Sequence, residues 1–357
     1  MAKCYICSNE LTDKNRSEEH IFLNAIGGVL KSKELICKLC NSKLGDDADS
    51  RLAKQLQPFS VLMNVKRDRG ETPPIEAIRS TKKEKILVYP GGKPSSIKPD
   101  IQYREENGKK TYHITARTQK EINKIYRGIK KKHPTATITD TGNIIENIDE
   151  KITIECDLRR EPLESVCKTA VGYYIYVGRD RKHILSFIDK LKAHDVLDLC
   201  NYCYDDNIKI GKSEGGIFHS IALVGEPNEK LLYAYIELFN YYHAFVLLNS
   251  NYEGDAFQNI YSYNLIRNGE SEAFFNSTVT REMADDILTK DLHDYGKALA
   301  REMQTTVREI EVKNLVNKVW SEIESEYSVQ YPDGIPTDIF IKAVSEKIAK
   351  GFLPYFK

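Results

Sequence analysis

The chain has 357 residues, a length that predicts two or three domains at about 100–200 residues per domain. Hydrophobic residues make up 41% and charged residues 29%, as in globular proteins, and no run of eighteen apolar residues could span a membrane. The N-terminal residues also lack the apolar stretch of a secretory signal, so a cytoplasmic or other reducing location is expected.

The formal net charge is zero, but the charges are unevenly distributed along the chain. Residues 1–70 contain twelve Lys and Arg against nine Asp and Glu, whereas residues 71–135 contain sixteen against seven. Residues 136–357 are therefore acidic. A basic middle region is expected where part of the surface meets a polyanion, and a run of solvated lysines is the alternative.

The first half of the chain predicts a small module followed by a strand-rich region. Residues 1–56 are dense in Cys, Gly, Asp and Asn, with a short helix expected after Asn41. Many Pro and Gly residues break the segment 57–99, which we interpret as a connecting region with one strand at Lys85–Tyr89. Residues 101–117 predict a hairpin that turns at Asn107-Gly108.

The later elements predict a second region that contains both helices and strands. A helix is expected over 118–132 and strand structure over 135–158, followed by two helical stretches within 162–199. Four strands are expected within 216–267: Phe218–Val224, Leu231–Tyr235, Ala244–Leu248 and Ile260–Leu265. Two long helices, at about 280–327 with a break and 336–350, close the chain.

These elements predict an α+β protein in which a small zinc-stapled module precedes a mixed α/β sheet and a helical C-terminal region. The expected domains are a module at 1–56, a basic strand-rich connecting region at 57–160, and an α+β regulatory or partner-binding domain at 161–357.

Four cysteines near the start predict a structural metal site. They form two Cys-x-x-Cys pairs, Cys4 with Cys7 and Cys37 with Cys40. Each pair can supply two thiolates from a tight turn, and two pairs complete the tetrahedral sulfur set that Zn²⁺ prefers. A fragment of about fifty residues has too small a core to hold itself, so the metal would supply folding energy.

The residues between and after these pairs resemble the HNH endonuclease family in its zinc-bound ββα-metal form. The first pair is followed by Glu18-Glu19-His20-Ile21-Phe22 and by Gly27-Gly28, and the second by Asn41, Gly45 and Asp49. The resemblance covers roughly residues 4–52. It implies that the module cuts nucleic acid, as N-terminal HNH effectors of bacterial anti-phage defence or restriction systems do.

The residue types suit phosphodiester hydrolysis, which needs a base to deprotonate water and a hard cation to stabilise charge on the phosphate. Histidine is the residue type whose free side chain titrates near neutral pH, so His20 is the candidate base. Glu19 and Asn41 can supply oxygen ligands and leave room for water and phosphate, as Mg²⁺ or Mn²⁺ would require. By resemblance, the histidine activates water and the other two bind the catalytic ion.

The sequence departs from the family pattern at several positions. Glu19 stands where an aspartate is commoner, and Leu23 stands where a proline is frequent. The third motif position, often a histidine, is Asp49 here, and it is a candidate ligand or an orienting residue. Asp46 and Asp47 are alternatives for that role.

Other charged and polar groups have competing interpretations. Lys124, Arg127, Lys130, Lys131 and Lys132 lie on one predicted helix and are candidate phosphate contacts, or else a solvated face. A third pair, Cys200-x-x-Cys203, lacks a partner pair and is interpreted as buried thiols. His219 lies in an apolar strand and is expected to be a core or surface residue.

The sequence therefore predicts a metal-dependent endonuclease that cuts DNA, with structural Zn²⁺ and catalytic Mg²⁺ or Mn²⁺. The acidic C-terminal region would act as sensor, as a homo-oligomer surface or as the binding site of a protein partner. One alternative is a zinc-dependent module that binds nucleic acid or protein without catalysis, and another is a nuclease that cuts RNA. The presence of Glu19, His20 and Asn41 together favours the nuclease.

Overall fold

The computed structural model describes residues 2–68, 70–116, 118–139, 142, 151–156, 158–328, 330–332 and 334–352. The chain forms two compact units, one made of residues 1–56 with 158–357 and the other of residues 57–157. The second unit is thus inserted between two segments of the first. No helix among the described residues is both long enough and apolar enough to cross a membrane.

The N-terminal module follows the order strand, strand, helix. Strand β1 (Glu19–His20) pairs antiparallel with β2 (Lys31–Ser32), and helix α1 (Lys38–Gln55) follows. The predicted ββα arrangement is confirmed. The helix begins three residues before Asn41 rather than after it, because Cys37 already takes the extended N-cap conformation.

The backbone geometry of the loop between β1 and β2 requires the two adjacent glycines of the module. Gly27 ends the short helix η1 (Asn24–Ile26) with a φ of 91°, a conformation that favours glycine. A Cβ atom on Gly28 would lie 2.0 Å from the carbonyl oxygen of Phe22. Both positions therefore require glycine for the local backbone to close.

The C-terminal part of the first unit is built on a six-stranded antiparallel sheet with the order β15-β14-β11-β12-β13-β9. Its strands are β9 (Cys200–Tyr202), β11 (Phe218–Glu226), β12 (Leu231–Leu238), β13 (Tyr242–Asn249), β14 (Phe257–Asn264) and β15 (Gly269–Glu270). A separate two-stranded pair joins β10 (Gly211–Lys212) to β16 (Ala273–Phe274). All four strands predicted within 216–267 are confirmed.

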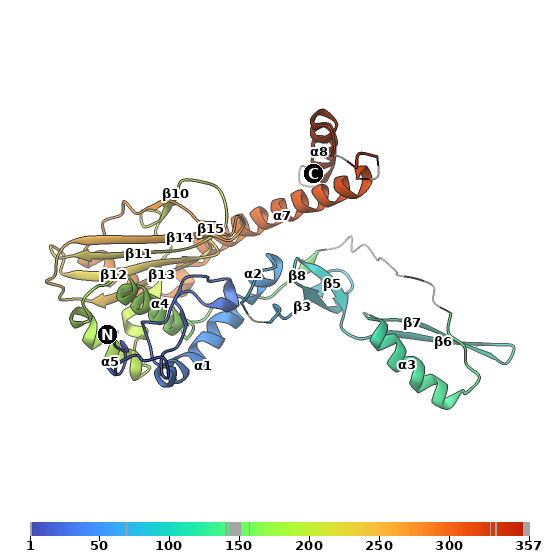
Figure 1. Ribbon diagram of the computed structural model, residues 1–357, viewed down its shortest axis with the longest axis horizontal. Helices are drawn as coiled ribbons and strands as arrows, with labels where there is room; N and C mark the ends of the chain where they lie inside the picture. Colours follow the sequence, from blue (N-terminus) through green and yellow to red (C-terminus); the bar gives the residue numbers. More distant parts are fainter. Residues whose placement is uncertain are drawn as a thin grey trace. The chain divides into compact units, whose positions relative to one another are not determined.

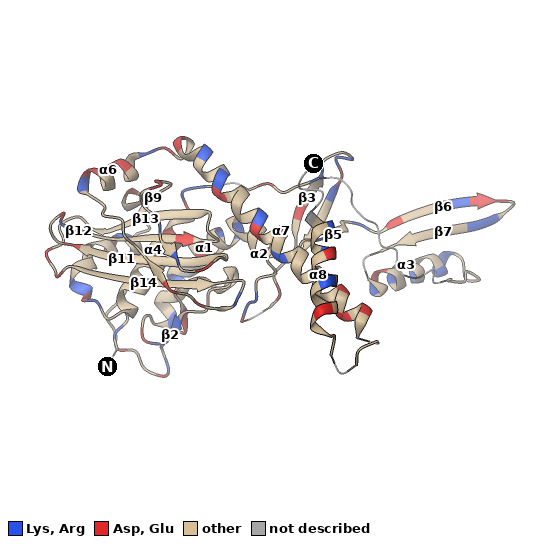
Figure 2. Ribbon diagram, turned by 90° about the horizontal axis from the view of Figure 1, so that it is seen from above, with Lys and Arg blue, Asp and Glu red and all other residues tan. Residues whose placement is uncertain are grey.

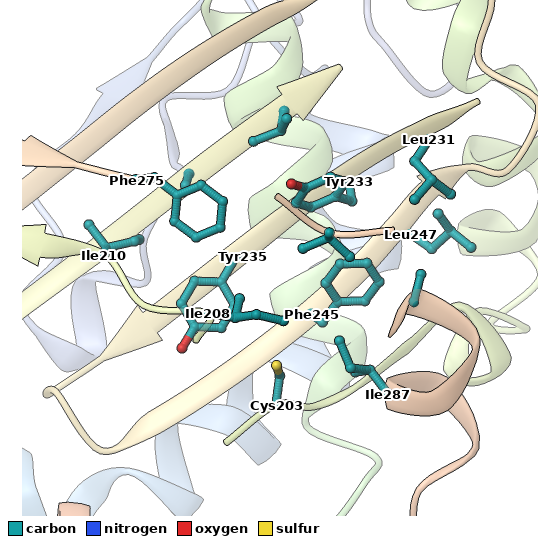
Figure 3. Packing of buried hydrophobic residues seen from close by; sticks show 14 residues of the cluster. Cys203, Ile208, Ile210, Leu231, Tyr233, Tyr235, Phe245, Leu247, Phe275 and Ile287 are labelled. Carbon is teal, nitrogen blue, oxygen red and sulfur yellow. The ribbon is translucent and has the colours of Figure 1, made fainter. Parts of the chain in front are cut away.

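Helices cover both faces of this sheet, which explains why its central strands are buried along almost their whole length. On one face lie α4 (Leu163–Tyr176) and α5 (Leu185–Lys192), and α4 also packs against α1 (Figure 1). On the other face, Tyr235, Phe245 and Phe275 pack with Ile287 of α6 (Arg281–Thr289), as Figure 3 shows. The module thus lies on the layer formed by α4.

Two further helices end the first unit. Helix α7 (Gly296–Tyr327) is preceded by η4 (Leu292–Tyr295), and α8 (Thr337–Phe352) packs against α7 through Val319, Ile323 and Ala343. The two helical stretches predicted within 162–199 and the closing helices with their break are confirmed. Short helices η2 (Arg181–Ile184) and η3 (Leu197–Leu199) complete the unit.

The second unit contains more strand structure than the sequence predicts. A four-stranded sheet has the order β5-β4-β3-β8, formed by β3 (Ile75–Arg79), β4 (Lys85–Tyr89), β5 (Lys93–Ser96) and β8 (Ile152–Thr153). Val61 of α2 (Gln57–Leu62) packs against it. Our interpretation of 57–99 as a connecting region with one strand is wrong. Strand β3 is only five residues long and begins just after Pro73-Pro74, and edge strand β5 carries no apolar alternation.

The rest of the second unit follows the prediction closely. Strands β6 (Asp100–Glu106) and β7 (Lys109–Thr115) form a hairpin that turns at Asn107-Gly108, where both φ angles are positive. Helix α3 (Gln119–Lys132) begins with its first turn capped by the Thr118 side chain. The predicted strand at 135–158 is wrong over 135–139, which are irregular, and its centre lies outside the described residues.

His219 joins the sheet to the N-terminal module. It lies fully buried on β11, where its Nε2 is 2.9 Å from the carbonyl oxygen of Ile26 and its ring stacks on Phe22. Its Nδ1 accepts a hydrogen bond from the backbone N–H of Phe239. Both ring nitrogens are therefore used by a neutral imidazole, with the proton on Nε2. His219 is a core residue, as the sequence predicts.

We expect acid to weaken this junction through His219. Burial lowers the pKa of His219 to about 4, from an ordinary 6.5, so the unfolded chain takes up a proton that the folded chain refuses. The contribution is complete above pH 6.5 and is lost as the pH falls from 6.5 to 4, by about 3 kcal/mol at most. Urea unfolding of the first unit at pH 7 and pH 5 should show a shallower pH dependence for His219→Gln than for wild type. Equal pH dependence would contradict the assignment.

Candidate active site

The four N-terminal cysteines converge as a zinc site requires. Their Sγ atoms all lie within 4.8 Å of one another, and those of Cys7 and Cys37 are 3.9 Å apart. Tetrahedral Zn²⁺ with Zn–S bonds of about 2.3 Å places its sulfurs about 3.8 Å apart. Cys4, Cys37 and Cys40 are buried, and burial raises the pKa of the Cys40 thiol. The donor set and its spacing fit Zn²⁺.

The C-terminal region supports the first cysteine turn directly. The Arg181 guanidinium donates from Nε to the carbonyl oxygen of Tyr5 at 2.7 Å and from Nη2 to that of Ile6 at 3.4 Å. Tyr5 is itself buried, and its N–H donates to the carbonyl oxygen of Leu35, next to the second pair. Residues that lie far apart in the sequence thus hold the Cys4–Cys7 turn, Arg181 through its side chain and Leu35 through its backbone.

Glu19, Asn41 and Asp49 meet around a single atom, the ammonium nitrogen of Lys168. The Nζ of Lys168 lies 2.7 Å from Glu19 Oε1, 3.0 Å from Asn41 Oδ1 and 2.8 Å from Asp49 Oδ2. Asn41 comes from the first turn of α1, Asp49 from a point two turns further, and Glu19 from β1. These three residues of one sequence motif therefore surround the same point, the ammonium nitrogen of Lys168.

Neighbouring groups fix the direction in which these oxygens point. The Asn41 Nδ2 donates to Ser17 Oγ at 3.0 Å, which turns its carbonyl oxygen toward Lys168. The second oxygen of Asp49 accepts from Ser165 Oγ at 2.7 Å. Of the other candidates, Asp47 is exposed and pairs with Arg51, and the side chain of Asp46 lies outside the described residues. Of the two acidic side chains described in this segment, Asp47 and Asp49, it is Asp49 that contacts Lys168.

His20 lines the same open hollow as the three oxygen donors. The hollow has a volume of about 580 Å³, and its wall includes His20, Glu19, Asn41, Asp49 and Lys168. His20 is half-buried, whereas Glu19 before it is 6% exposed. Both side chains line the hollow, the histidine at its more exposed wall and the glutamate in its buried part.

The charge on Lys168 is stable in this position. Burial on its own lowers the pKa of Lys168, but the carboxylates of Glu19 and Asp49 outweigh burial and raise the pKa above its ordinary value. A lysine that is only 6% exposed is rare without such partners. The side chain is therefore an ammonium ion surrounded by oxygen.

These donors fit a catalytic cation by type, but their position is taken by Lys168. Carboxylate and amide oxygens are the ligands that Mg²⁺ and Mn²⁺ prefer. Mg²⁺ would need them at about 2.0–2.1 Å from a centre that they now share with an ammonium group. In the conformation described, the residues hold Lys168 where the sequence predicts a metal ion.

The sequence motif does not include Lys168 and Ser165, which lie more than a hundred residues beyond Asp49. One signal was available: Lys168 is the single basic residue of helix α4, whose residues are mostly apolar and buried. A charged side chain within such a helix predicts a specific buried partner. Nothing in the sequence names that partner.

The remaining candidates lie elsewhere. Lys124, Arg127, Lys130, Lys131 and Lys132 are all exposed on α3 of the second unit, where Figure 2 shows basic residues on α3 and on β7. Cys200 and Cys203 are both fully buried, and Cys203 packs in the cluster between the sheet and α6. Among the described residues, the four N-terminal cysteines are the group of His, Cys, Asp and Glu side chains close enough to hold a metal ion.

Comparison with known proteins agrees with the geometry of the module. Residues 4–57 match the family model described as HNH endonuclease. No curated protein and no solved structure matches the chain. The match covers the zinc turns, β1, His20 and the whole of α1, so residues 4–57 form a module of the HNH endonuclease family.

Proposed function

We propose that the protein is a metal-dependent HNH endonuclease that hydrolyses DNA phosphodiester bonds, with His20 as the base that deprotonates water. The observation that carries this is the convergence of Glu19, Asn41 and Asp49 on one point of a hollow that His20 also lines. This convergence lies within the segment that matches the HNH endonuclease family. A non-catalytic zinc module would not require it.

The chain's own residues have distinct roles in this proposal. The half-buried His20 accepts a proton from a water molecule that attacks phosphorus, and its place at the hollow keeps it accessible to substrate. Glu19, Asn41 and Asp49 would hold Mg²⁺ or Mn²⁺, which when bound stabilises negative charge on the phosphate and on the leaving oxygen. The cysteines would hold structural Zn²⁺, which would fix the positions of β1 and α1 relative to each other.

Three regions would divide the work. Residues 1–56 cut, residues 57–160 contact DNA, and residues 161–357 sense a signal, bind a partner or form a homo-oligomer through their acidic surface. A role as an effector of bacterial anti-phage defence or restriction is part of this proposal and rests on the resemblance of the N-terminal module to such effectors.

The experiment that tests the proposal incubates the purified, zinc-loaded chain with supercoiled plasmid DNA and, separately, with structured RNA, in Mg²⁺ or Mn²⁺. Nicked or linear plasmid is the expected product. Cleavage of RNA alone would favour the RNA-cutting alternative. Binding of DNA without cleavage of either substrate, by the wild type and by Lys168→Met alike, would favour the non-catalytic zinc module.

The basic residues of α3 are proposed to contact DNA phosphates. Replacing Lys130, Lys131 and Lys132 with glutamine should weaken DNA binding and lower the slope of log K against log salt by up to about 0.9 per lost contact. Fluorescence anisotropy measures both quantities, in a His20→Ala background so that DNA stays intact. Each of the three side chains is exposed, so folding should be unaffected.

A matched control removes the same charge from the first unit, with Lys182, Lys190 and Lys192 replaced by glutamine. This control should keep the affinity and salt slope nearly unchanged. If both triple variants lost affinity equally, the effect would be one of net charge, and α3 would not be a specific contact surface.

A further inference from the structure

The environment of Lys168 is that of a bound cation. Its ammonium group has three N–H donors, and three oxygens lie within 3.0 Å of it, from Glu19, Asn41 and Asp49. All three donors are therefore used, and the side chain is 6% exposed. Lys168 has no donor left for a substrate phosphate, so in this conformation it is not a catalytic residue.

A divalent metal ion and this ammonium group exclude each other. Both would need the same three oxygens and would therefore have to occupy nearly the same position. Two cations that close together would repel each other strongly in a buried site. The oxygens now lie 2.7–3.0 Å from nitrogen and would have to close to about 2.0–2.1 Å around Mg²⁺. Lys168 must leave before a metal ion binds.

The backbone that carries Lys168 belongs to the C-terminal region. Helix α4 packs on strands β13, β11, β12 and β9 and forms part of the buried layer beneath the sheet. It reaches the module through Ser165 Oγ, which donates to Asp49, and through Thr169 Oγ1, which donates to the carbonyl oxygen of Ile21 at 2.8 Å. The position of the ammonium group is therefore set by how α4 sits against α1.

A second polar contact joins the same two helices at the edge of the interface. The guanidinium of Arg51 on α1 lies 3.0 Å from Glu164 on α4, and Glu164 also binds the His194 ring. Glu164 itself is buried, whereas Arg51 and His194 are half-exposed or exposed, so solvent screens these contacts more than those of Lys168. This edge is therefore the more solvent-accessible side of the interface, and the Lys168 cluster is its buried centre.

We propose that Lys168 is a built-in competitor of the catalytic metal ion, which holds the nuclease module in a metal-free state until α4 moves away from α1. A ligand or partner that binds the C-terminal region and separates these helices would free the three oxygens. The metal ion could then bind to them, and cleavage would start. This inference rests on the proposed function, since it concerns the same three oxygen donors.

The competition has a direct consequence for metal affinity. While the ammonium occupies the oxygens, the apparent dissociation constant for metal is raised by the ratio of closed to open states. Removing the ammonium removes that factor. We expect Lys168→Met to bind Mn²⁺ at least tenfold more tightly than wild type, and Mn²⁺ to raise its Tm but not that of wild type.

The experiment titrates Mn²⁺ into the zinc-loaded full chain, followed by electron paramagnetic resonance, in parallel with thermal unfolding. A Lys168→Met, Asp49→Asn double variant should lose the tighter Mn²⁺ binding of Lys168→Met. This loss would show that the added affinity comes from these oxygens rather than from surface carboxylates. Lys192→Met removes the same charge from an exposed position that pairs with Asp189 and should bind Mn²⁺ as wild type does.

Equal Mn²⁺ affinity of wild type and Lys168→Met would overturn the proposal. If Lys168→Met folds only when Mn²⁺ is present, the metal replaces the ammonium and the proposal stands. If it does not fold under any condition, Ser165→Ala decides: this variant loosens α4 and should gain Mn²⁺ affinity, and no gain would overturn the proposal. Since no nucleic acid is present, these outcomes are independent of whether the protein is a nuclease.

Discussion

Replacement of His20 with alanine is expected to slow plasmid cleavage by about 100-fold to 10,000-fold, the range over which a positioned general base accelerates proton transfer. The imidazole is half-buried at the wall of the hollow, so its loss removes the base without leaving a large cavity in the core. Zinc content and Tm should therefore stay close to wild type. Single-turnover cleavage of a labelled plasmid measures the effect on the chemical step.

Two controls separate the role of His20 as a base from a structural one. Added imidazole should restore part of the activity of His20→Ala, since the small base can enter the open hollow. His293→Ala, at an exposed position far along the chain, should cleave at the wild-type rate. Cleavage by His20→Ala at an unchanged rate would contradict the proposed mechanism.

If Lys168 competes with the metal ion as proposed, the wild-type rate in these assays should depend on how often Lys168 leaves the three oxygens. If the wild type cuts slowly without its trigger, Lys168→Met provides a background in which His20→Ala can be compared. Failure of both backgrounds to cut DNA or RNA would leave the non-catalytic zinc module as the function of residues 4–57.

Replacement of Cys37 with serine should have the second large effect, on the fold of the module itself. Cys37 belongs to the four-cysteine cluster that fits Zn²⁺ and is also the N-cap residue of α1, the helix that carries Asn41 and Asp49. Structural zinc contributes about 10–16 kcal/mol of folding free energy in small zinc-finger peptides. Zinc content should fall from one ion per chain toward zero, and cleavage should be lost with it.

Atomic absorption measures the zinc, and limited proteolysis near α1 measures the loss of structure. Cys156→Ser provides the matched control, because this cysteine is exposed and lies outside the zinc cluster. Unchanged zinc content in Cys37→Ser would refute the zinc site. Loss of zinc with an intact, resistant α1 would instead show that α4 and Arg181 hold the module without metal.

Local patterns explain which parts of the fold could be predicted. Cys-x-x-Cys spacing, Asn107-Gly108 and the apolar strand-forming segments in 216–267 each encode their structure within a few residues, and the structure follows them. Strands β3 and β5 were missed because one follows two prolines and the other has no buried side. Their pairing with β4 comes from tertiary context, which overrides local propensity.

The candidate site shows the same division between local and distant signals. Glu19, His20, Asn41 and Asp49 stand in one motif of about thirty residues, so a resemblance can point to all of them. Lys168 acts through a contact across more than a hundred residues, and no periodicity in α4 reveals which oxygens it meets. Burial of an ion pair depends on the packed interface, and sequence order carries little information about that.

The insertion of residues 57–157 has a consequence for how this protein can vary. Gln55, at the end of α1, accepts a hydrogen bond at 2.8 Å from the backbone N–H of Arg159, so the chain leaves and re-enters the first unit at neighbouring points. Closing a loop between such points costs only about 0.6 kcal/mol more for each doubling of its length. The inserted segment is therefore exchangeable in principle: another folded segment could replace the β6–β7 hairpin and the basic helix α3 while the N-terminal module keeps its contact with α4.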